Sequence, residues 1–103
     1  MRLTELEPTF LIRDDDHHFH MTDNIQEADG VEFLCPVCLG THAIICWSPQ
    51  VPQTTSPTPG RWNMQGSGYN DLTLVAGSSS ILLQGAPCGA HFFIRNGDIC
   101  RCQ

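Results

Sequence analysis

The chain has 103 residues, with eleven acidic side chains, five basic ones and no lysine. Its length suits one domain, spanning residues 1–103, whose core is thin enough to benefit from a metal or another cross-link. The 41% hydrophobic content excludes an intrinsically disordered chain. The shortage of cations argues against direct binding to nucleic acid, because that requires a cluster of positive charge.

No apolar run approaches the roughly 20 residues that a membrane-spanning helix needs. Residues 1–8 also lack the apolar stretch of a signal peptide. We therefore expect a protein that is neither held in a membrane nor secreted through a signal peptide, and that works in a reducing compartment.

Acidic residues concentrate in the first third of the chain. Residues 1–32 hold nine of the eleven carboxylates, against only Arg2 and Arg13. Such a segment is typical of a solvated surface that keeps a protein soluble, and it also suits contact with a basic partner.

Several short strands are expected along the chain. Residues 9–13 form a strand rich in β-branched and aromatic side chains, residues 14–16 a turn, and residues 17–21 the return strand. A short helix is expected from Thr22 or Asp23 to Asp29, with Gly30 ending it. Hydrophobic alternation and short apolar runs predict further strands at residues 31–34, 42–47, 71–75 and 81–84.

Residues 48–60 predict an extended loop, because prolines at this density exclude a helix or an interior strand. Trp47 and Trp62 flank the loop and are expected to hold its two ends against the domain. A loop of this kind is either a passive connector or a contact surface. The residues of the expected contact surface are Pro49, Val51, Pro52, Pro57, Pro59 and Trp62.

The last segment gives the clearest local prediction. Asn96-Gly97 stands between two β-rich segments, which favours a two-residue hairpin turn with positive φ at both positions. The resulting register pairs Arg95 with Asp98 as a charge pair, Ile94 with Ile99, Phe93 with Cys100, Phe92 with Arg101, and His91 with Cys102. Since side chains alternate between faces, His91, Phe93, Cys100 and Cys102 share one face.

Two pairs of metal-ligating residues share one spacing. Cys35-Pro-Val-Cys38 is followed by Leu-Gly in the form of a zinc knuckle, and Cys88-Gly-Ala-His91 repeats the two-residue gap. Together they predict one structural Zn²⁺ held by Cys35, Cys38, Cys88 and His91. Cys102 is the alternative fourth ligand, because the hairpin register sets it opposite His91.

The six cysteines also allow two other roles. A disulfide framework requires an oxidising compartment, which the lack of a signal peptide argues against. Cys46 and Cys100 are expected to be small buried residues that bind no metal. The sequence therefore favours zinc over disulfides.

The expected zinc is structural, because a shell of four protein ligands leaves no position for water or substrate. The sequence also lacks the His-x-Glu of nucleobase deaminases and the His-Glu-x-x-His of metalloproteases. A second cluster, Asp14 to Asp16 with His17, His18 and His20, is either a second metal site or a solvated turn and edge strand. The solvated turn is the simpler interpretation.

Several segments taken together resemble a known family. They are Val31 to Pro36, Thr41-His42 with Cys46-Trp47-Ser48, Pro59 to Trp62, Asp71 to Leu74, and Cys88-Gly-Ala-His-Phe-Phe-Ile-Arg-Asn-Gly97. They are similar to small phage and prophage proteins of unknown function that are predicted to bind zinc and are often labelled ammonia monooxygenase. The resemblance implies a zinc-binding phage protein, located in the virion or in the host cytoplasm. The label itself fits poorly, since that enzyme class is a membrane-embedded copper protein.

The expected fold is a mainly β, compact, zinc-ribbon-like antiparallel domain with a C-terminal hairpin and one short helix; a small α+β fold is the alternative. The expected function is non-enzymatic binding to a phage or host protein, either as a virion component or as a factor directed against the host, including its defences. The competing hypothesis is a small metal-dependent enzyme that uses an exchangeable zinc ligand or the region of His17, His18 and His20.

Overall fold

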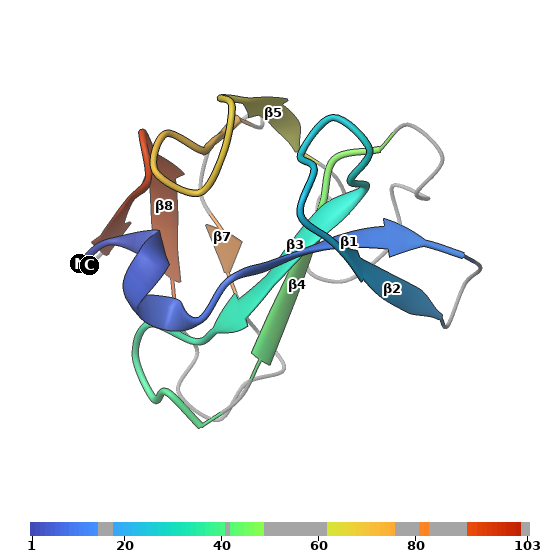
Figure 1. The fold of residues 1–103 in the computed structure, drawn as a ribbon. Helices are drawn as coiled ribbons and strands as arrows, with labels where there is room; N and C mark the ends of the chain where they lie inside the picture. The colour runs from blue at the N-terminus through green and yellow to red at the C-terminus, as the bar shows by residue number, and fades with distance from the viewer. Residues whose placement is uncertain (15–17, 41, 49–61, 76–80, 83–90, 102–103) are drawn as a thin grey trace.

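The computed structural model describes residues 1–14, 18–40, 42–48, 62–75, 81–82 and 91–101 (Figure 1). Within these ranges the chain forms nine strands and one short 3-10 helix, and every strand pairs antiparallel to its neighbours. The predicted mainly β, antiparallel fold is therefore confirmed.

The largest sheet has four strands in the order β2-β1-β3-β4. Its strands are β1 (Thr9–Arg13), β2 (Phe19–Thr22), β3 (Gly30–Leu34) and β4 (His42–Cys46). Because successive side chains of a strand point to opposite faces, burial alternates along the middle of β3 and of β4. Val31 and Phe33 of β3 are buried, as are Ala43 and Ile45 of β4, whereas Glu32 and Ile44 between them are only half-buried.

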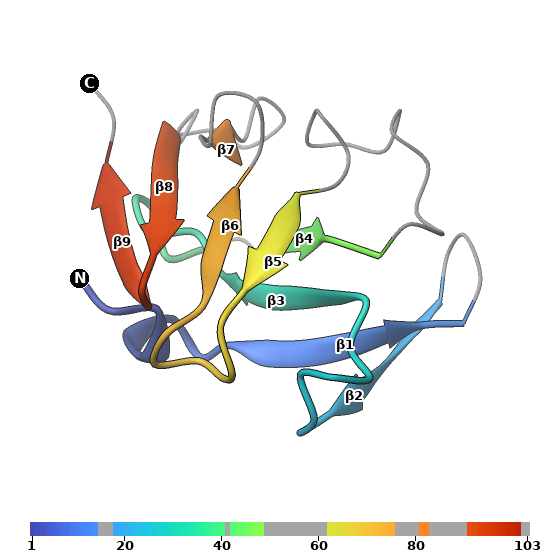
Figure 2. The same cartoon turned by 90° about the horizontal axis from the view of Figure 1, so that it is seen from above.

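Two smaller sheets cover this one. β5 (Asn63–Gln65) pairs with β6 (Thr73–Val75), and β8 (His91–Arg95) lies between β7 (Ile81–Leu82) and β9 (Asp98–Arg101). β6 and β8 are in contact, and Figure 2 shows β5, β6, β8 and β9 side by side, crossing the direction of β1 and β3. The core lies between these layers and includes Phe10, Phe33 and Phe92.

The C-terminal hairpin forms as predicted. Asn96 and Gly97 have φ of 51° and 76°, and the strands pair Arg95 with Asp98, Ile94 with Ile99, Phe93 with Cys100 and Phe92 with Arg101. Phe92, Ile94 and Ile99 are buried, so the face that they share is the inner face of the hairpin.

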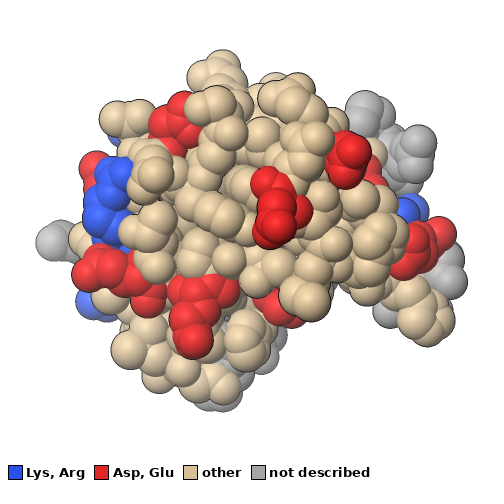
Figure 3. Space-filling view, in the orientation of Figure 1, with Lys and Arg blue, Asp and Glu red and all other residues tan. Residues whose placement is uncertain are grey.

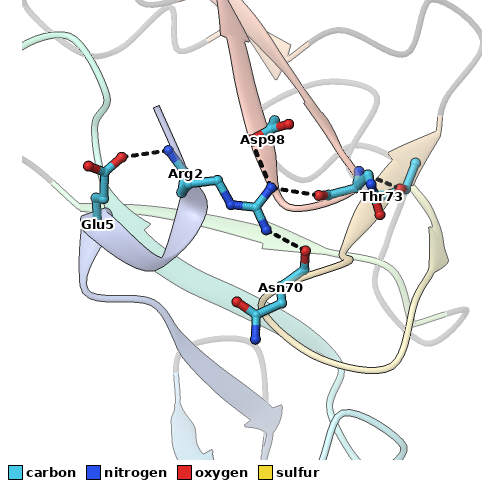
Figure 4. Close-up of polar contacts among 6 residues, drawn as sticks. Arg2, Glu5, Asn70, Thr73 and Asp98 are labelled. Carbon is cyan, nitrogen blue, oxygen red and sulfur yellow. Dashed lines mark hydrogen bonds and ion pairs between the residues drawn. The ribbon is translucent and has the colours of Figure 1, made fainter.

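The predicted charge pair between Arg95 and Asp98 is wrong. The Asp98 carboxylate instead accepts a hydrogen bond from the Arg2 guanidinium at 2.8 Å, and Arg2 also donates to the carbonyls of Asn96 and Asn70 at 3.0 and 2.6 Å (Figure 4). The Arg95 guanidinium lies over the Phe93 ring, 4.8 Å from its centroid. A cationic side chain gains more from three oxygens than from one, which explains why Arg2 holds this position.

The helix predicted between Thr22 and Asp29 is also wrong: residues 25–27 form a turn. The side chains of Thr22 and Asn24 accept the backbone N–H groups of Asn24 and Gln26, at 3.1 and 2.9 Å. Such local bonds compete with helical ones, and Asp29 N–H already donates to Leu11 of β1. The 3-10 helix η1 (Leu3–Leu6) lies elsewhere and buries Leu3 and Leu6 completely.

The ends of the predicted proline-rich loop are anchored. Trp47 donates its indole N–H to the Ala28 carbonyl at 3.0 Å, and the Trp62 backbone N–H donates to Cys46 at 2.9 Å. Pro49, Val51, Pro52, Pro57 and Pro59 lie outside the described residues. Trp62 is only 2% exposed, so its ring belongs to the core and presents no contact surface to a partner.

Candidate metal centre

The first predicted ligand pair lies on a tight turn that directly follows β3. Cys35 is fully buried and Cys38 is exposed, and residues 36–38 form the turn between them. The Leu39 N–H donates to the Cys35 carbonyl at 3.0 Å, which closes the turn. In Figure 1 this segment loops below β8.

Leu39 has a φ of 56°, a left-handed conformation that a leucine rarely adopts. It costs roughly 1 kcal/mol relative to ordinary backbone, so the surrounding structure must impose it. The position is the one immediately after the second cysteine, where the chain must turn back beneath the two sulfurs. The sequence suggested Gly40 for this role, because glycine adopts positive φ without strain.

An aromatic contact brings the knuckle strand next to the strand of the second pair. Phe33 lies two residues before Cys35, and Phe92 directly follows His91. Their rings meet edge to face with centroids 5.9 Å apart, and both side chains are fully buried. β3 and β8 therefore pack against each other close to the predicted ligands, although they lie far apart in the sequence.

His91 is the first residue of β8, is half-buried and pairs with Leu82 of β7. Alternation along β8 places it on the opposite face from Phe92 and Ile94. Cys88 and Cys102 lie outside the described residues. Among the residues that are described, no three His, Cys, Asp or Glu side chains come together as a metal-binding group.

The donor chemistry of the knuckle fits zinc. Two thiolates separated by two residues on a closed turn are the usual half of a tetrahedral zinc shell. No disulfide joins any two of the described cysteines, which are Cys35, Cys38, Cys46 and Cys100. When bound there, zinc would supply a strong cross-link between the end of β3 and the segment around β8.

The two remaining described cysteines differ in exposure. Cys46, at the end of β4, is 4% exposed as expected, and burial raises the pKa of its thiol. The nearby Asp29 carboxylate raises that pKa further, whereas Arg13 lowers it in part. The prediction for Cys100 is wrong, because its side chain is exposed on β9. An edge strand buries only one of its faces, and Cys100 lies on the outer one.

The structure describes part of the predicted Asp and His cluster at residues 14–20. His20 on β2 is exposed, and its Nδ1 lies 2.8 Å from both carboxylate oxygens of Asp14. His18 is exposed as well and accepts the Asp14 N–H at its carbonyl. Asp15, Asp16 and His17 lie outside the described residues. The contact orients the His20 ring, and sequence spacing alone did not indicate it.

A pocket that the sequence did not indicate opens at the Thr22 end of β2. It is lined by Pro8, Thr9, Met21, Thr22, Asp23 and Tyr69. Tyr69 stacks on Phe10 with ring centroids 4.1 Å apart, and its hydroxyl oxygen accepts the Phe10 N–H at 2.9 Å. No local pattern could have linked Tyr69 to β1, because 59 residues separate it from Phe10.

Within the described part of the chain, no helix has the length and apolarity needed to cross a membrane. Comparison of the chain with models of protein families, with curated proteins and with solved structures gives no match.

Proposed function

We propose that this chain is a zinc-stabilised β domain that works without catalysis, by binding another protein. The observation that supports the metal most directly is the knuckle: Cys35 and Cys38 flank a turn that the Leu39–Cys35 hydrogen bond closes and that holds Leu39 at positive φ. In the proposed centre Cys35, Cys38 and Cys88 supply three ligands, and either His91 or Cys102 supplies the fourth.

The non-enzymatic role follows from the proposed shell. Four protein ligands saturate a tetrahedral zinc, so neither a substrate nor an activated water has a position on the metal. The zinc would instead tie β3 to the C-terminal hairpin, where the Phe33–Phe92 contact already supports that geometry. Binding energy of order 10 kcal/mol is comparable to the whole stability of a small domain.

The proposed setting comes from the resemblance to phage and prophage proteins. The chain would act in the virion or in the host cytoplasm, on a phage protein or on a host protein such as a defence factor. Its contact surface would comprise the proline-rich segment 48–60 and the acidic first third of the chain. Trp62 is left out of that surface, because its ring is buried.

Metal analysis of purified wild-type protein and of single serine variants tests the zinc centre. We expect about one zinc per chain in the wild type, and loss of both the metal and the melting transition in Cys35→Ser and Cys38→Ser. Cys100→Ser is the matched control, because it removes an exposed thiol outside the proposed shell. Zinc-free wild-type protein, or zinc retained in both knuckle variants, would refute the centre.

Affinity capture from infected cells tests the protein-binding role. We expect the full chain to recover a reproducible partner, and a chain lacking residues 50–58 to keep its zinc and its melting transition but to recover less of that partner. Equal recovery by both chains would reduce segment 48–60 to a connector. Failure of the full chain to recover any partner, from cells or from virions, would count against the role itself.

One observation favours the competing hypothesis of a small metal-dependent enzyme. The Asp14 carboxylate fixes the His20 ring, an arrangement that suits a metal ligand or a general base. A second metal site there would raise the zinc content to about two per chain, and His20→Ala would return it to one. Equal zinc content in the wild type and His20→Ala would show that the Asp14–His20 pair is a surface contact and binds no zinc.

A further inference from the structure

The edges of the sheets differ in how they are covered. The N-terminal residues cover the edge of β9: Ile99 N–H donates to the Met1 carbonyl and Leu3 N–H to the Gly97 carbonyl, both at 2.8 Å. At the edge of β4, the Cys46 carbonyl accepts the Trp62 N–H. β2 is the other edge strand of the four-stranded sheet, and none of the described residues hydrogen-bonds to its backbone from the outer side.

The pairing of β2 with β1 fixes which backbone groups point outward. The His18 carbonyl accepts the Asp14 N–H, and the register continues through Ile12 opposite His20 and Phe10 opposite Thr22. In an antiparallel pair, alternate residues direct their N–H and C=O groups to opposite sides. The N–H and C=O groups of Phe19 and Met21 therefore point away from β1, toward solvent.

This edge has one protection that is common in edge strands, its short length of four residues, and lacks several others. Lysine, proline or a bulge normally prevents another chain from adding to an edge. β2 contains no lysine and no proline, its register is regular, and Met21 is 75% exposed. A regular edge of this length with an exposed apolar side chain can accept a short added strand.

The pocket beside β2 is open to solvent and offers both polar and apolar surface. Its volume is about 580 Å³, and it combines apolar walls from Met21 and Tyr69 with the Asp23 carboxylate. Tyr69 is held in place by Phe10, both through ring stacking and through its hydrogen bond. A lysine or arginine of an added strand can lay its aliphatic stem on these walls and direct its charge to Asp23.

The charge around β2 indicates which kind of partner segment fits this edge. Asp14 and Asp23 flank the strand, Arg13 lies opposite Phe19 on β1, and the face drawn in Figure 3 shows more acidic than basic side chains. A second copy of the chain pairing through the same edge would bring two acidic surfaces together. Charge complementarity therefore favours a basic segment of a different protein.

We infer that the outer edge of β2 is a docking site for an extended segment of a partner protein that carries lysine or arginine. The segment adds to the four-stranded sheet as a fifth strand, through the outward backbone groups of Phe19 and Met21, and places one basic side chain in the pocket at Asp23. This inference rests on the proposed protein-binding role and identifies the chemistry of the partner.

Titration of the zinc-loaded, ¹⁵N-labelled full chain with synthetic decapeptides tests the inference. One peptide alternates valine and arginine, and its matched control alternates valine and glutamate. We expect the arginine peptide to bind saturably, with amide shifts and slowed hydrogen exchange at Phe19 and Met21, and the glutamate peptide not to bind. Absence of binding by the arginine peptide, equal binding by both, or shifts that map elsewhere would overturn the inference.

Three variants separate backbone pairing from simple charge attraction. Met21→Pro removes the outward N–H, which an edge strand tolerates, and should abolish binding. Met21→Ala keeps that N–H and should retain most of the binding, whereas Asp23→Asn should weaken it about two- to fivefold. Binding by Met21→Pro equal to that of Met21→Ala would rule out strand addition.

The zinc content of each sample distinguishes the two proposals. Peptide binding by a chain that holds no zinc would leave the docking site standing and refute the metal centre. If a zinc-loaded chain with a native melting transition does not bind the arginine peptide, the docking site alone is refuted. Dimerisation through β2 in sedimentation measurements would identify a second copy as the occupant and contradict the inference.

Discussion

Phe33 and Phe92 meet edge to face in the core, with ring centroids 5.9 Å apart and an interplanar angle of 80°. The first belongs to the strand that leads into the Cys35 knuckle and the second to the strand that begins at His91. The contact joins the four-stranded sheet to the C-terminal hairpin next to the proposed metal ligands.

Phe92→Ala should therefore lower the free energy of unfolding by about 3–5 kcal/mol, because a fully buried phenylalanine is lost and a cavity remains. The neighbouring Phe93 is only half-buried on the opposite face, so Phe93→Ala should cost about 1 kcal/mol. Urea denaturation of the zinc-loaded variants measures both values. Equal denaturation midpoints for the two variants would show that the contact does not stabilise the core as described.

Gly97 should be intolerant of any side chain. Its φ is 76°, and a Cβ atom there would overlap the backbone carbonyl of Asn70 and lie 2.7 Å from the Arg2 guanidinium. Gly97→Ala should lower the free energy of unfolding by about 2–4 kcal/mol, since the turn and the Arg2 contacts must both shift. Gly68→Ala is the control, because a Cβ there meets no atom within 4 Å. Thermal melting compares the two, and indistinguishable melting temperatures would contradict the geometry.

Asp71 should make the domain less stable in acid. Hydrogen bonds from the Ser67 backbone, the Ser67 hydroxyl and the Gly68 backbone hold the pKa of this carboxyl below its ordinary value of 3.8. The fold therefore favours the ionised form. That stabilisation is present above the unfolded-state pKa and is lost as the pH falls through the lower, folded-state pKa.

Denaturation measured from pH 6 downward checks this. Asp71→Asn cannot ionise, so its stability should fall less than that of the wild type below about pH 4. The difference should be small, because the site is accessible to solvent. Parallel stability curves for the two proteins would show that Asp71 makes no contribution.

The thiols of Cys46 and Cys100 should react at very different rates. Burial raises the pKa of Cys46, with a further increase from Asp29, so this thiol is protonated at neutral pH and is also shielded from reagents. Cys100 is exposed on β9. Iodoacetamide at pH 7.5 should alkylate Cys100 roughly tenfold faster or more, as followed by peptide mass spectrometry. Similar rates would place Cys46 nearer the surface than the fold allows.

Short sequence patterns predicted the features that depend on residues close together in the chain. β-branched and aromatic content identified β1, and hydrophobic alternation identified β3. Asn96-Gly97 predicted β8 and the hairpin register, because a two-residue turn admits few geometries. The predicted helix failed because Thr22 and Asn24 bind nearby backbone groups instead. The partner of Asp98 was missed, since Arg2 lies 96 residues away in the sequence and no local signal relates the two.

At the candidate site, too, the feature formed by neighbouring residues was predicted and the feature formed by distant segments was not. The knuckle spacing of Cys35 and Cys38 predicted a turn at the end of a strand, and the turn is there. The positive φ of this turn falls on Leu39 rather than on Gly40, the glycine of the knuckle motif. The pocket at Asp23 and Tyr69 was not predicted, because it forms only when distant segments pack together.

The most direct test of the proposed metal centre is X-ray absorption at the zinc edge of the purified full-length chain. One zinc per chain with three or four sulfur ligands at about 2.3 Å is the predicted result, and a single nitrogen at about 2.0–2.1 Å would identify His91 rather than Cys102 as the fourth ligand. A shell of nitrogen and oxygen atoms only, or protein that holds no zinc, would contradict the account.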